Sequence, residues 1–478
     1  MSHRQAGTLT LRLGNEVLTT INTNGTQTLE FRAETGEAQL KLQADADWDG
    51  VVRHVSLTRK PDNGPTVDWD EPAYSALRGW PAVPFFHDQR MIFAGGAVPN
   101  GIFMSKPGAY FNFDDGDGSD DDGIAYSIAE NRIAEIRAIT ALRHMQVFTS
   151  EGELYIPIGE ARPLTPANVM FKKQTPLGIS RYVAPCEFDG AVLFIPPSEA
   201  TVREFAYSDI QQAYSSDAVS LLAQHLIRAP RDMEVSLESQ GQPEQYAYIV
   251  NDDGTMPVFL SNRAEEITGW ALWSTQGKFC GVANVNDRVF VVVEREIGGQ
   301  GPTLYLEYFD SGLTLDCATV QQSQTETSVW TVPWLPNTDV YVTAGNYYLG
   351  YGASDGTGEV ITAYLTTSAQ LGLNYSLQLT TLSPEVQLDD GPSVGEQRRV
   401  VTASVVLDQT LNLEVTHQQR PGEFSIRQVS DDLSAEPVAL TGRQDFNMLG
   451  WDDHGTVTIT QNAPLECTIL GLNTELEY

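Results

Sequence analysis

Short runs in which apolar and polar residues alternate, separated by turn formers, cover most of this chain. Near its start the alternation occupies Thr8–Leu13 and Thr28–Arg32, with a turn beginning at Gly14. Alternation with a period of two between such turns predicts half-buried antiparallel strands. We therefore expect residues 1–60 to form a small β-sandwich module, which ends in a linker rich in Pro and turn formers at 59–65.

A second pattern dominates from about residue 80 to about residue 310. A short strand of large apolar residues is followed by a polar turn and a second strand, and this unit occurs five times, with leading strands at Arg90–Ala94, Met145–Thr149, Ala191–Ile195, Tyr246–Val250 and Arg288–Val293. Intervals of about 40 to 55 residues are typical of propeller blades, although hairpins stacked in two sandwiches would give a similar pattern. We expect residues 61–320 to form a β-propeller-like domain.

One helix is predicted inside this domain. Ser215–Asp217 supplies a capping sequence ahead of Ala218–Ile227, whose apolar face would carry Leu222 and Leu226. From residue 321 to residue 478 the strand patterns continue but the blade rhythm is lost, which predicts a C-terminal β-rich platform domain. The expected fold class is thus mostly β, with a sandwich, a propeller-like centre and a β domain at the end.

The charge is strongly acidic, with 63 Asp and Glu against 29 Lys and Arg and a formal net charge of -34. Such a surface does not bind nucleic acid tightly. The carboxylates either form a solvated surface or line a channel through which a polyanion slides without sticking. No signal peptide and no run of about 18 apolar residues is found, so we expect no membrane segment and synthesis in a cytoplasm.

Two acidic clusters are candidates for metal binding. Asp45, Asp47 and Asp49 form the DxDxDG opening of a calcium loop, in which alternate carboxylates converge on one hard cation. The twelfth position of an EF-hand requires Glu, but the chain has Ser56 there, so a tight acidic turn is the alternative to a Ca²⁺ site. The second cluster, Asp114–Gly123, is either a solvated loop or a similar cation site.

No sequence motif for catalysis stands out. The chain has no GxSxG elbow, no HExxH and no GxxxxGK[ST] loop, and its four cysteines show no CxxC spacing, which favours buried thiols over disulfides or zinc. We therefore expect no enzyme and no cofactor apart from the possible Ca²⁺. Two groups of aromatic residues stand out: Trp80, Tyr110, Phe111 and Phe113, and Trp270 with Trp273. These fit packing between sheets, with a carbohydrate-binding platform as the alternative.

Several stretches, taken in order, resemble the tail nozzle proteins of short-tailed bacteriophages, also called tail tubular protein B. The matching stretches are Gly79–Gly95, Ser105–Phe113, Leu164–Val169, Gln174–Gly178, Val202–Tyr207 with Leu221–Leu226, and Gln461–Leu470. Their order and spacing hold over about residues 70–310 and again at the C-terminal end. No single stretch is specific, but the ordered set is.

The resemblance implies a structural virion protein of the phage tail, made in the host cytoplasm. It implies a homo-hexameric ring below the portal and the tail adaptor protein, next to tail fibres or a spike. The ring would be a gated conduit that conducts genomic DNA without binding it specifically. The alternative function is a glycan-binding or glycan-degrading tail protein that uses the aromatic groups and the DxDxDG turn.

Overall fold

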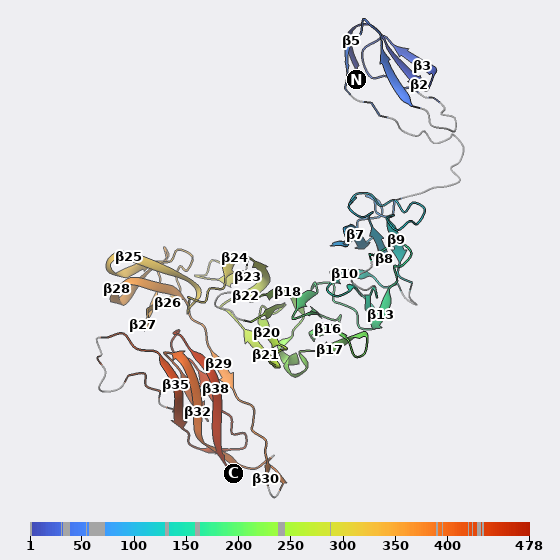
Figure 1. The fold of residues 1–478 in the computed structure, drawn as a ribbon. Helices are drawn as coiled ribbons and strands as arrows, with labels where there is room; N and C mark the ends of the chain where they lie inside the picture. Colours follow the sequence, from blue (N-terminus) through green and yellow to red (C-terminus); the bar gives the residue numbers. More distant parts are fainter. Residues whose placement is uncertain are drawn as a thin grey trace. The chain divides into compact units, whose positions relative to one another are not determined.

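The computed structural model describes residues 2–29, 31, 39–53, 55–56, 72–129, 133–157, 163–237, 244–286, 288–388, 391–393, 395–418, 420–422, 424–427, 432 and 435–478. The chain forms two compact units, Met1–Pro72 and Ala73–Tyr478 (Figure 1). The linker predicted at 59–65 lies outside the described residues.

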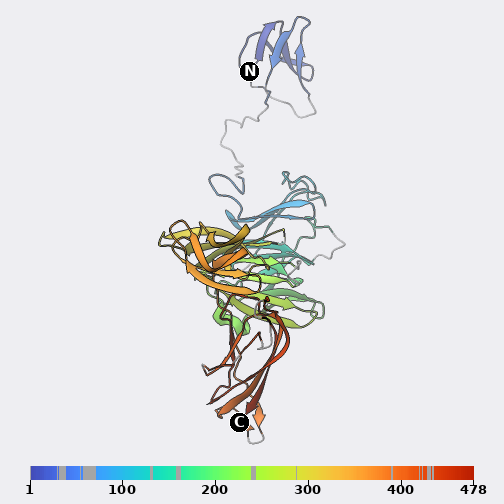
Figure 2. The ribbon, with the colours of Figure 1, turned by 90° about the vertical axis from the view of Figure 1, so that its left-hand side faces the viewer.

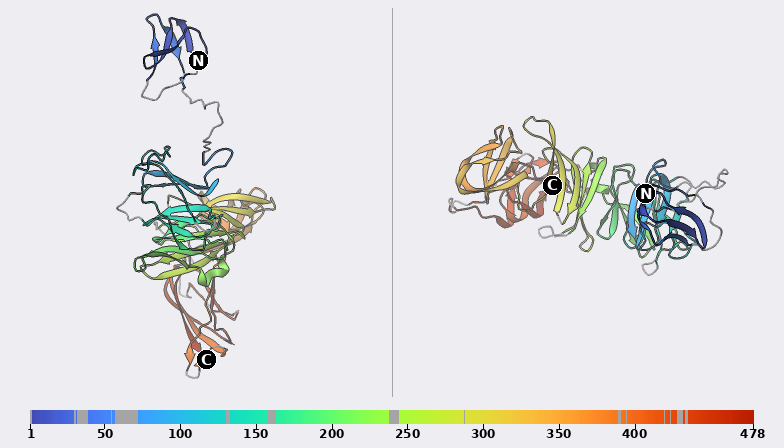
Figure 3. Two further views of the ribbon diagram at one scale, coloured as in Figure 1. Left: turned by 90° about the vertical axis from the view of Figure 1, so that its right-hand side faces the viewer. Right: turned by 90° about the horizontal axis from the view of Figure 1, so that it is seen from above.

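The N-terminal unit, drawn in blue in Figure 3, contains two small antiparallel sheets. One pairs β1 (Ser2–Ala6) with β5 (Asp49–Val52), and the other has the order β3 (Glu16–Ile21), β2 (Leu9–Leu13), β4 (Leu40–Ala44). The strand predicted at residues 28–32 is wrong, because Thr28, Leu29 and Phe31 lie in no strand. Both edges of β2 are already paired, one with β3 and the other with β4. Thr28, Leu29 and Phe31 lie in the connection from β3 to β4.

The larger unit begins with five successive antiparallel sheets, each made of strands in sequence order. The first two are β6 (Val83–His87), β7 (Arg90–Gly95), β8 (Val98–Met104) and β9 (Ile124–Ser127), then β10 (Ile136–Ala141), β11 (Met145–Thr149), β12 (Glu153–Tyr155) and β13 (Lys172–Thr175). The third and fourth are β14 (Cys186–Phe188), β15 (Ala191–Phe194), β16 (Arg203–Ser208) and β17 (Ala213–Ala218), then β18 (Pro230–Ser236), β19 (Tyr246–Asn251), β20 (Met256–Asn262) and β21 (Ile267–Trp273). The fifth has three strands, β22 (Lys278–Val285), β23 (Arg288–Glu296) and β24 (Pro302–Tyr308).

Neighbouring sheets in this series share hydrophobic cores, as propeller blades do. In β15, Val192 and Phe194 enter the core shared with the preceding sheet, whereas Leu193 enters the core shared with the following sheet. A strand buried on both faces reads as a continuous apolar run, which is why the sequence pattern located β11, β15 and β19. β7 and β23 are apolar runs as well, although they bury only alternate residues fully along most of their length. The β-propeller-like architecture predicted for this region is confirmed.

The helix predicted over Ala218–Ile227 is wrong in type and extent. Residues up to Ala218 belong to β17, and only a 3-10 helix at Leu221–Leu226 follows. Leu222, expected on the apolar face, is 94% exposed, and within the helix only Ala223 is buried. Residues 213–218, which include the expected cap, pair with β16 as a strand. Too few residues then remain before Ile227 for a regular α-helix.

Two further cores follow the fifth sheet. The first belongs to the sheet β25 (Asp316–Thr331), β28 (Glu359–Leu373), β26 (Asp339–Ala344), β27 (Tyr347–Ala353). The boundary predicted between 320 and 321 falls inside β25. Across the described ranges no helix is long and apolar enough to span a membrane.

The second core lies in the C-terminal strands, which are drawn in orange to red in Figure 2. One sheet has the order β29 (Gln378–Thr380), β37 (Thr458–Thr460), β33 (Glu414–His417), β34 (Arg420–Gly422). In the other, β32 (Arg398–Thr410) pairs with β35 (Leu440–Asn447), β36 (Trp451–Asp452) and β38 (Thr468–Glu477). A short hairpin joins β30 (Gln387–Leu388) to β31 (Gly391–Pro392).

Candidate functional site

The first predicted metal site lies in the turn between β4 and β5. Asp45 does not point into a cation site here, because its Oδ2 accepts the backbone N–H of Thr8 at 2.7 Å and the Thr8 hydroxyl at 2.5 Å. Asp49 lies at the start of β5. Among the described residues no group of three or more acidic, His or Cys side chains is placed to hold a metal ion, so Asp45, Asp47 and Asp49 are not brought together as ligands.

The second acidic cluster is organised by two basic side chains of the protein itself. The buried guanidinium of Arg90 donates to the carbonyl oxygens of Ser105, Asp122 and Asp120 at 2.7, 2.6 and 3.1 Å. Lys106 Nζ lies 2.8 Å from Asp122 Oδ1 and 3.4 Å from Asp114 Oδ2. The position that a cation would take beside Asp122 is therefore occupied by an ammonium group.

Asp122 also holds the turn of this loop, since its Oδ2 accepts the N–H groups of Asp117 and Ser119 at 3.2 and 2.8 Å. The hydrogen bond from Lys106, followed by that from Ser119, lowers the pKa of the Asp122 carboxyl. A lowered carboxyl pKa stabilises the folded loop above the ordinary Asp value of about 3.9, and this contribution is lost as the pH falls through the folded value.

We expect Lys106→Met to make the acidic loop open at a higher pH than in the wild type, because the Asp122 carboxyl then loses the donor that lowers its pKa most. Hydrogen exchange of the 114–123 peptide, corrected for the intrinsic rate and followed from pH 7 downward, measures this opening. Lys172→Met, which replaces an exposed lysine of β13, is the control. Identical opening curves for the Lys106→Met protein and the wild type would contradict the assignment.

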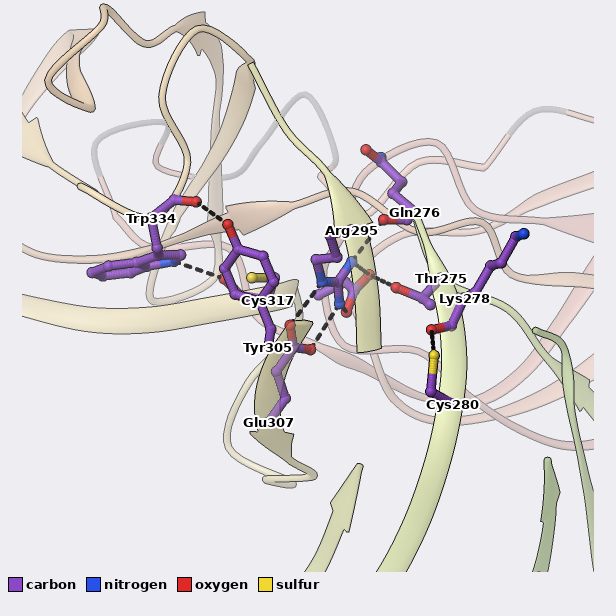
Figure 4. Close-up of polar contacts among 10 residues, drawn as sticks. Thr275, Gln276, Lys278, Cys280, Arg295, Tyr305, Glu307, Cys317 and Trp334 are labelled. Atoms are coloured by element: carbon purple, nitrogen blue, oxygen red, sulfur yellow. Dashed lines mark hydrogen bonds and ion pairs between the residues drawn. The ribbon is translucent and has the colours of Figure 1, made fainter. Parts of the chain in front are cut away.

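A buried polar cluster lies where the fifth sheet meets β25, and Figure 4 shows its side chains. Arg295 at the end of β23 has a fully buried side chain whose Nε and Nη2 donate to the Glu307 carboxylate, both at 2.7 Å. Its Nη2 and Nη1 also donate to Asp316 at 2.9 and 3.2 Å, and Nη1 reaches the Gln276 carbonyl oxygen at 3.0 Å. All five N–H groups of the guanidinium thus have acceptors.

In this cluster Arg295 links two carboxylates from different strands. Burial acts to lower the pKa of Arg295, but hydrogen bonds and charges from Glu307 and Asp316 outweigh it and raise that pKa. Both carboxylates accept hydrogen bonds from this one cation. The junction thus ties β23, β24 and β25 together, along with the chain before β22.

The thiol nearest this junction, Cys317, is half-buried. Burial, followed by the charge of Glu307, raises the pKa of the Cys317 thiol, and thiols become nucleophilic only as thiolates. Trp334 Nε1 donates to the Cys317 carbonyl oxygen at 3.3 Å, and Tyr305 Oη donates to the Trp334 carbonyl oxygen at 3.1 Å. The four cysteines are free thiols, of which Cys280 is exposed and the others half-buried.

The two aromatic groups have different environments. Trp270 packs as predicted: its ring stacks on Phe259 with centroids 4.5 Å apart, and its Nε1 donates to the Val219 carbonyl oxygen at 3.1 Å. In contrast, Trp80 and Tyr110 are exposed, and Phe111 is 99% exposed. The interpretation that these residues fill the space between sheets is therefore wrong for Trp80, Tyr110 and Phe111, whereas Phe113 stacks on Phe93 of β7.

Sequence reasoning missed one buried carboxyl, Glu153 of β12. Burial raises its pKa, while hydrogen bonds from the Thr175 hydroxyl and from the Leu177 and Gly178 backbone oppose that effect. The only sequence signal was a charged residue directly ahead of Leu154 and Tyr155 in a predicted strand. Among the described residues, the side chain that hydrogen-bonds to the Glu153 carboxyl is Thr175.

Comparison with known proteins identified fold likenesses only. No protein-family model and no curated protein matches the chain. Among solved structures, the chain is similar to BamB from Moraxella catarrhalis (10% identity, 49% of this chain and 59% of that chain, TM-score 0.29). It is also similar to the dihydro-heme d1 dehydrogenase NirN (8%, 59% and 56%, TM-score 0.30) and to Bacteroides ovatus xyloglucan PUL GH43B (10%, 84% and 91%, TM-score 0.22).

The match spans less than two thirds of the first two of these chains. Likenesses at such TM-scores carry no argument about substrate or partner, so the functional interpretation depends on the chain's own residues.

Proposed function

We propose that this chain is a structural subunit of the tail of a short-tailed phage, forming the nozzle ring that conducts DNA below the portal and adaptor. The observation that supports this most is the ordered set of stretches that resemble tail nozzle proteins. Within the fold these stretches include the β6–β7 hairpin, the loop after β8 and the segment from β16 to the 3-10 helix.

The polar clusters are consistent with a structural role. Arg90 and Arg295 are buried and satisfied by backbone carbonyls or carboxylates, which fixes loops and joins sheets. The net charge of -34 fits a conduit from which a polyanion is repelled rather than bound. A ring of this kind requires each subunit to offer two different contact surfaces, because cyclic assemblies larger than dimers use heterologous contacts.

The mass and symmetry of the whole 478-residue chain in solution test this proposal. We expect particles of about six times the 52.5 kDa chain mass by light scattering, with six-fold symmetry and a central channel in electron micrographs. A protein that stays monomeric at all accessible concentrations and cleaves a polysaccharide would overturn it.

A glycan-binding or glycan-degrading tail protein remains the second candidate, favoured by the exposed rings of Trp80 and Phe111. Aromatic faces stack on sugar rings, so Trp80→Ala and Phe111→Ala would abolish retention on immobilised host polysaccharide under this candidate. Under the nozzle proposal neither variant affects such retention, because the wild type is not retained.

A further inference from the structure

The blade series ends in two sheet faces that no blade covers. Interior strands such as β11, β15 and β19 place alternate side chains into two different cores, one on each side of the sheet. The first and the fifth sheet each share such a core with one neighbouring blade only. Within the described part of the chain, no core cluster contains residues of both end blades.

The uncovered face of the fifth sheet is aliphatic and aromatic. Val289, Val291 and Val293 point into the core shared with the fourth blade, so the residues between them point the other way. The register aligns Phe290 with Tyr308 and Val292 with Leu306, and Leu306 is 74% exposed. We call this set the last-blade face: Phe290, Val292, Leu304, Leu306 and Tyr308. The sheet has three strands where the preceding sheets have four, which leaves the edge of β24 unpaired as well.

The outer face of the first sheet is aromatic, and Tyr74 covers part of it, with its ring centroid 5.4 Å from that of Phe103. Ile92 and Ala94 point into the shared core, whereas Phe93 and its partner Phe103 point away from it. Loop residues add rings to this side: Phe113 stacks on Phe93 with centroids 5.4 Å apart, and Tyr110 meets Phe86 edge-on at 5.5 Å. Phe86 is 62% exposed. We call this set the first-blade face: Phe86, Phe93, Phe103, Tyr110 and Phe113.

An arginine lies at one end of the last-blade face, and a group of carboxylates lies next to the first-blade face. Arg288 is exposed, its guanidinium lies over the Tyr308 ring at 5.3 Å, and it makes no ion pair within the described residues. Next to the first-blade face, the loop after Phe113 exposes a group of carboxylates: Asp115, Asp117, Asp120 and Asp121. The last-blade face also carries one acidic residue, Glu294, which is aligned with Leu304 at the end of the face away from Arg288.

We propose that the first-blade face of one copy packs on the last-blade face of the next copy, so that blade stacking continues from subunit to subunit. Within the chain, each pair of successive blades is held by the same kind of apolar contact, and the two end faces are its unused halves. The occupant is therefore a second copy of this chain, with the Arg288 side facing the acidic loop of its neighbour. The inference rests on the proposed function, since it names the contact that would build the ring.

Two charge substitutions at exposed positions test the contact: Leu306→Asp on the last-blade face and Phe86→Asp on the first-blade face. Each variant alone is expected to be monomeric by mass photometry, whereas an equimolar mixture is expected to form dimers and nothing larger. The mixture stops at dimers because each variant keeps one intact face, and two intact faces of opposite kind can meet only once. Leu222→Asp, at the exposed position in the 3-10 helix, is the control and should assemble like the wild type.

The other outcomes separate the two proposals. A wild-type ring that persists in both variants would overturn the end-face contact and leave the nozzle ring standing. A monomeric wild type would overturn both. Assembly lost in only one variant would indicate a contact between identical faces and would also overturn the inference. Melting temperatures equal to that of the monomeric wild-type fraction show that the variants are folded.

Discussion

Replacement of Arg295 by Met is expected to lower the free energy of unfolding by about 3–5 kcal/mol, the cost typical of breaking a buried ion pair from one side. The guanidinium has no exposed surface and serves two carboxylates and one carbonyl oxygen. Met fills a similar volume but donates no hydrogen bond, so Glu307 and Asp316 would remain as two half-buried negative charges without their shared cation. The effect therefore comes from the groups left behind more than from the bond removed.

The matched control is Arg443→Met in β35, whose ion pair with Asp445 at 2.7 Å is exposed on both sides. Exposed pairs contribute roughly 0–1 kcal/mol, so this variant should unfold close to the wild type. Urea denaturation followed by tryptophan fluorescence measures both proteins. Equal losses in the two variants would mean that the Arg295 cluster is as well solvated as the surface pair.

The second large effect is expected for Phe148→Ala, with a loss of about 3–5 kcal/mol in the free energy of unfolding. Phe148 of β11 is fully buried, and its ring lies 5.6 Å from those of Phe194 and Phe205 in the next blade. Removal of the ring leaves a cavity between two blades, and the strands on both sides limit how far the neighbouring side chains can move in to fill it. Cavities that cannot collapse cost the most.

Phe111→Ala removes the same group from a fully exposed position and should change stability by no more than about 0.5 kcal/mol. Differential scanning calorimetry of both variants gives the comparison. If Phe148→Ala melted like Phe111→Ala, the second and third sheets could not share the core described for them.

The blade positions could be predicted from the sequence because one strand of each blade is an apolar run, and in the middle blades this strand, β11, β15 or β19, is buried on both faces. Continuous apolar runs such as Ala191–Ile195 have few alternative interpretations when turns flank them. The outer strands gave no such signal. β13, with the sequence Lys-Lys-Gln-Thr, is half exposed, and only pairing with β12 makes it a strand.

The Arg295 junction could not be predicted, because a buried arginine looks like a surface residue in a sequence. Its partners Glu307 and Asp316 lie on two other strands, and only the three-dimensional pairing of β23, β24 and β25 brings them together. The acidic loop was misleading for a similar reason. Its carboxylates suggested a cation, and the cation proved to be Lys106 of the same chain.

The stacking of blades in sequence order also affects how the chain can form during synthesis. Each of the five sheets of the blade series is built from a continuous stretch of the chain. From the second sheet onward, a shared core joins each sheet to the one before it. During synthesis the blades can therefore fold one after another as they leave the ribosome, and each new blade packs on the folded blade before it. At every stage of synthesis the newest blade has one face without a following blade, and the completed series keeps two such outer faces, one at each end.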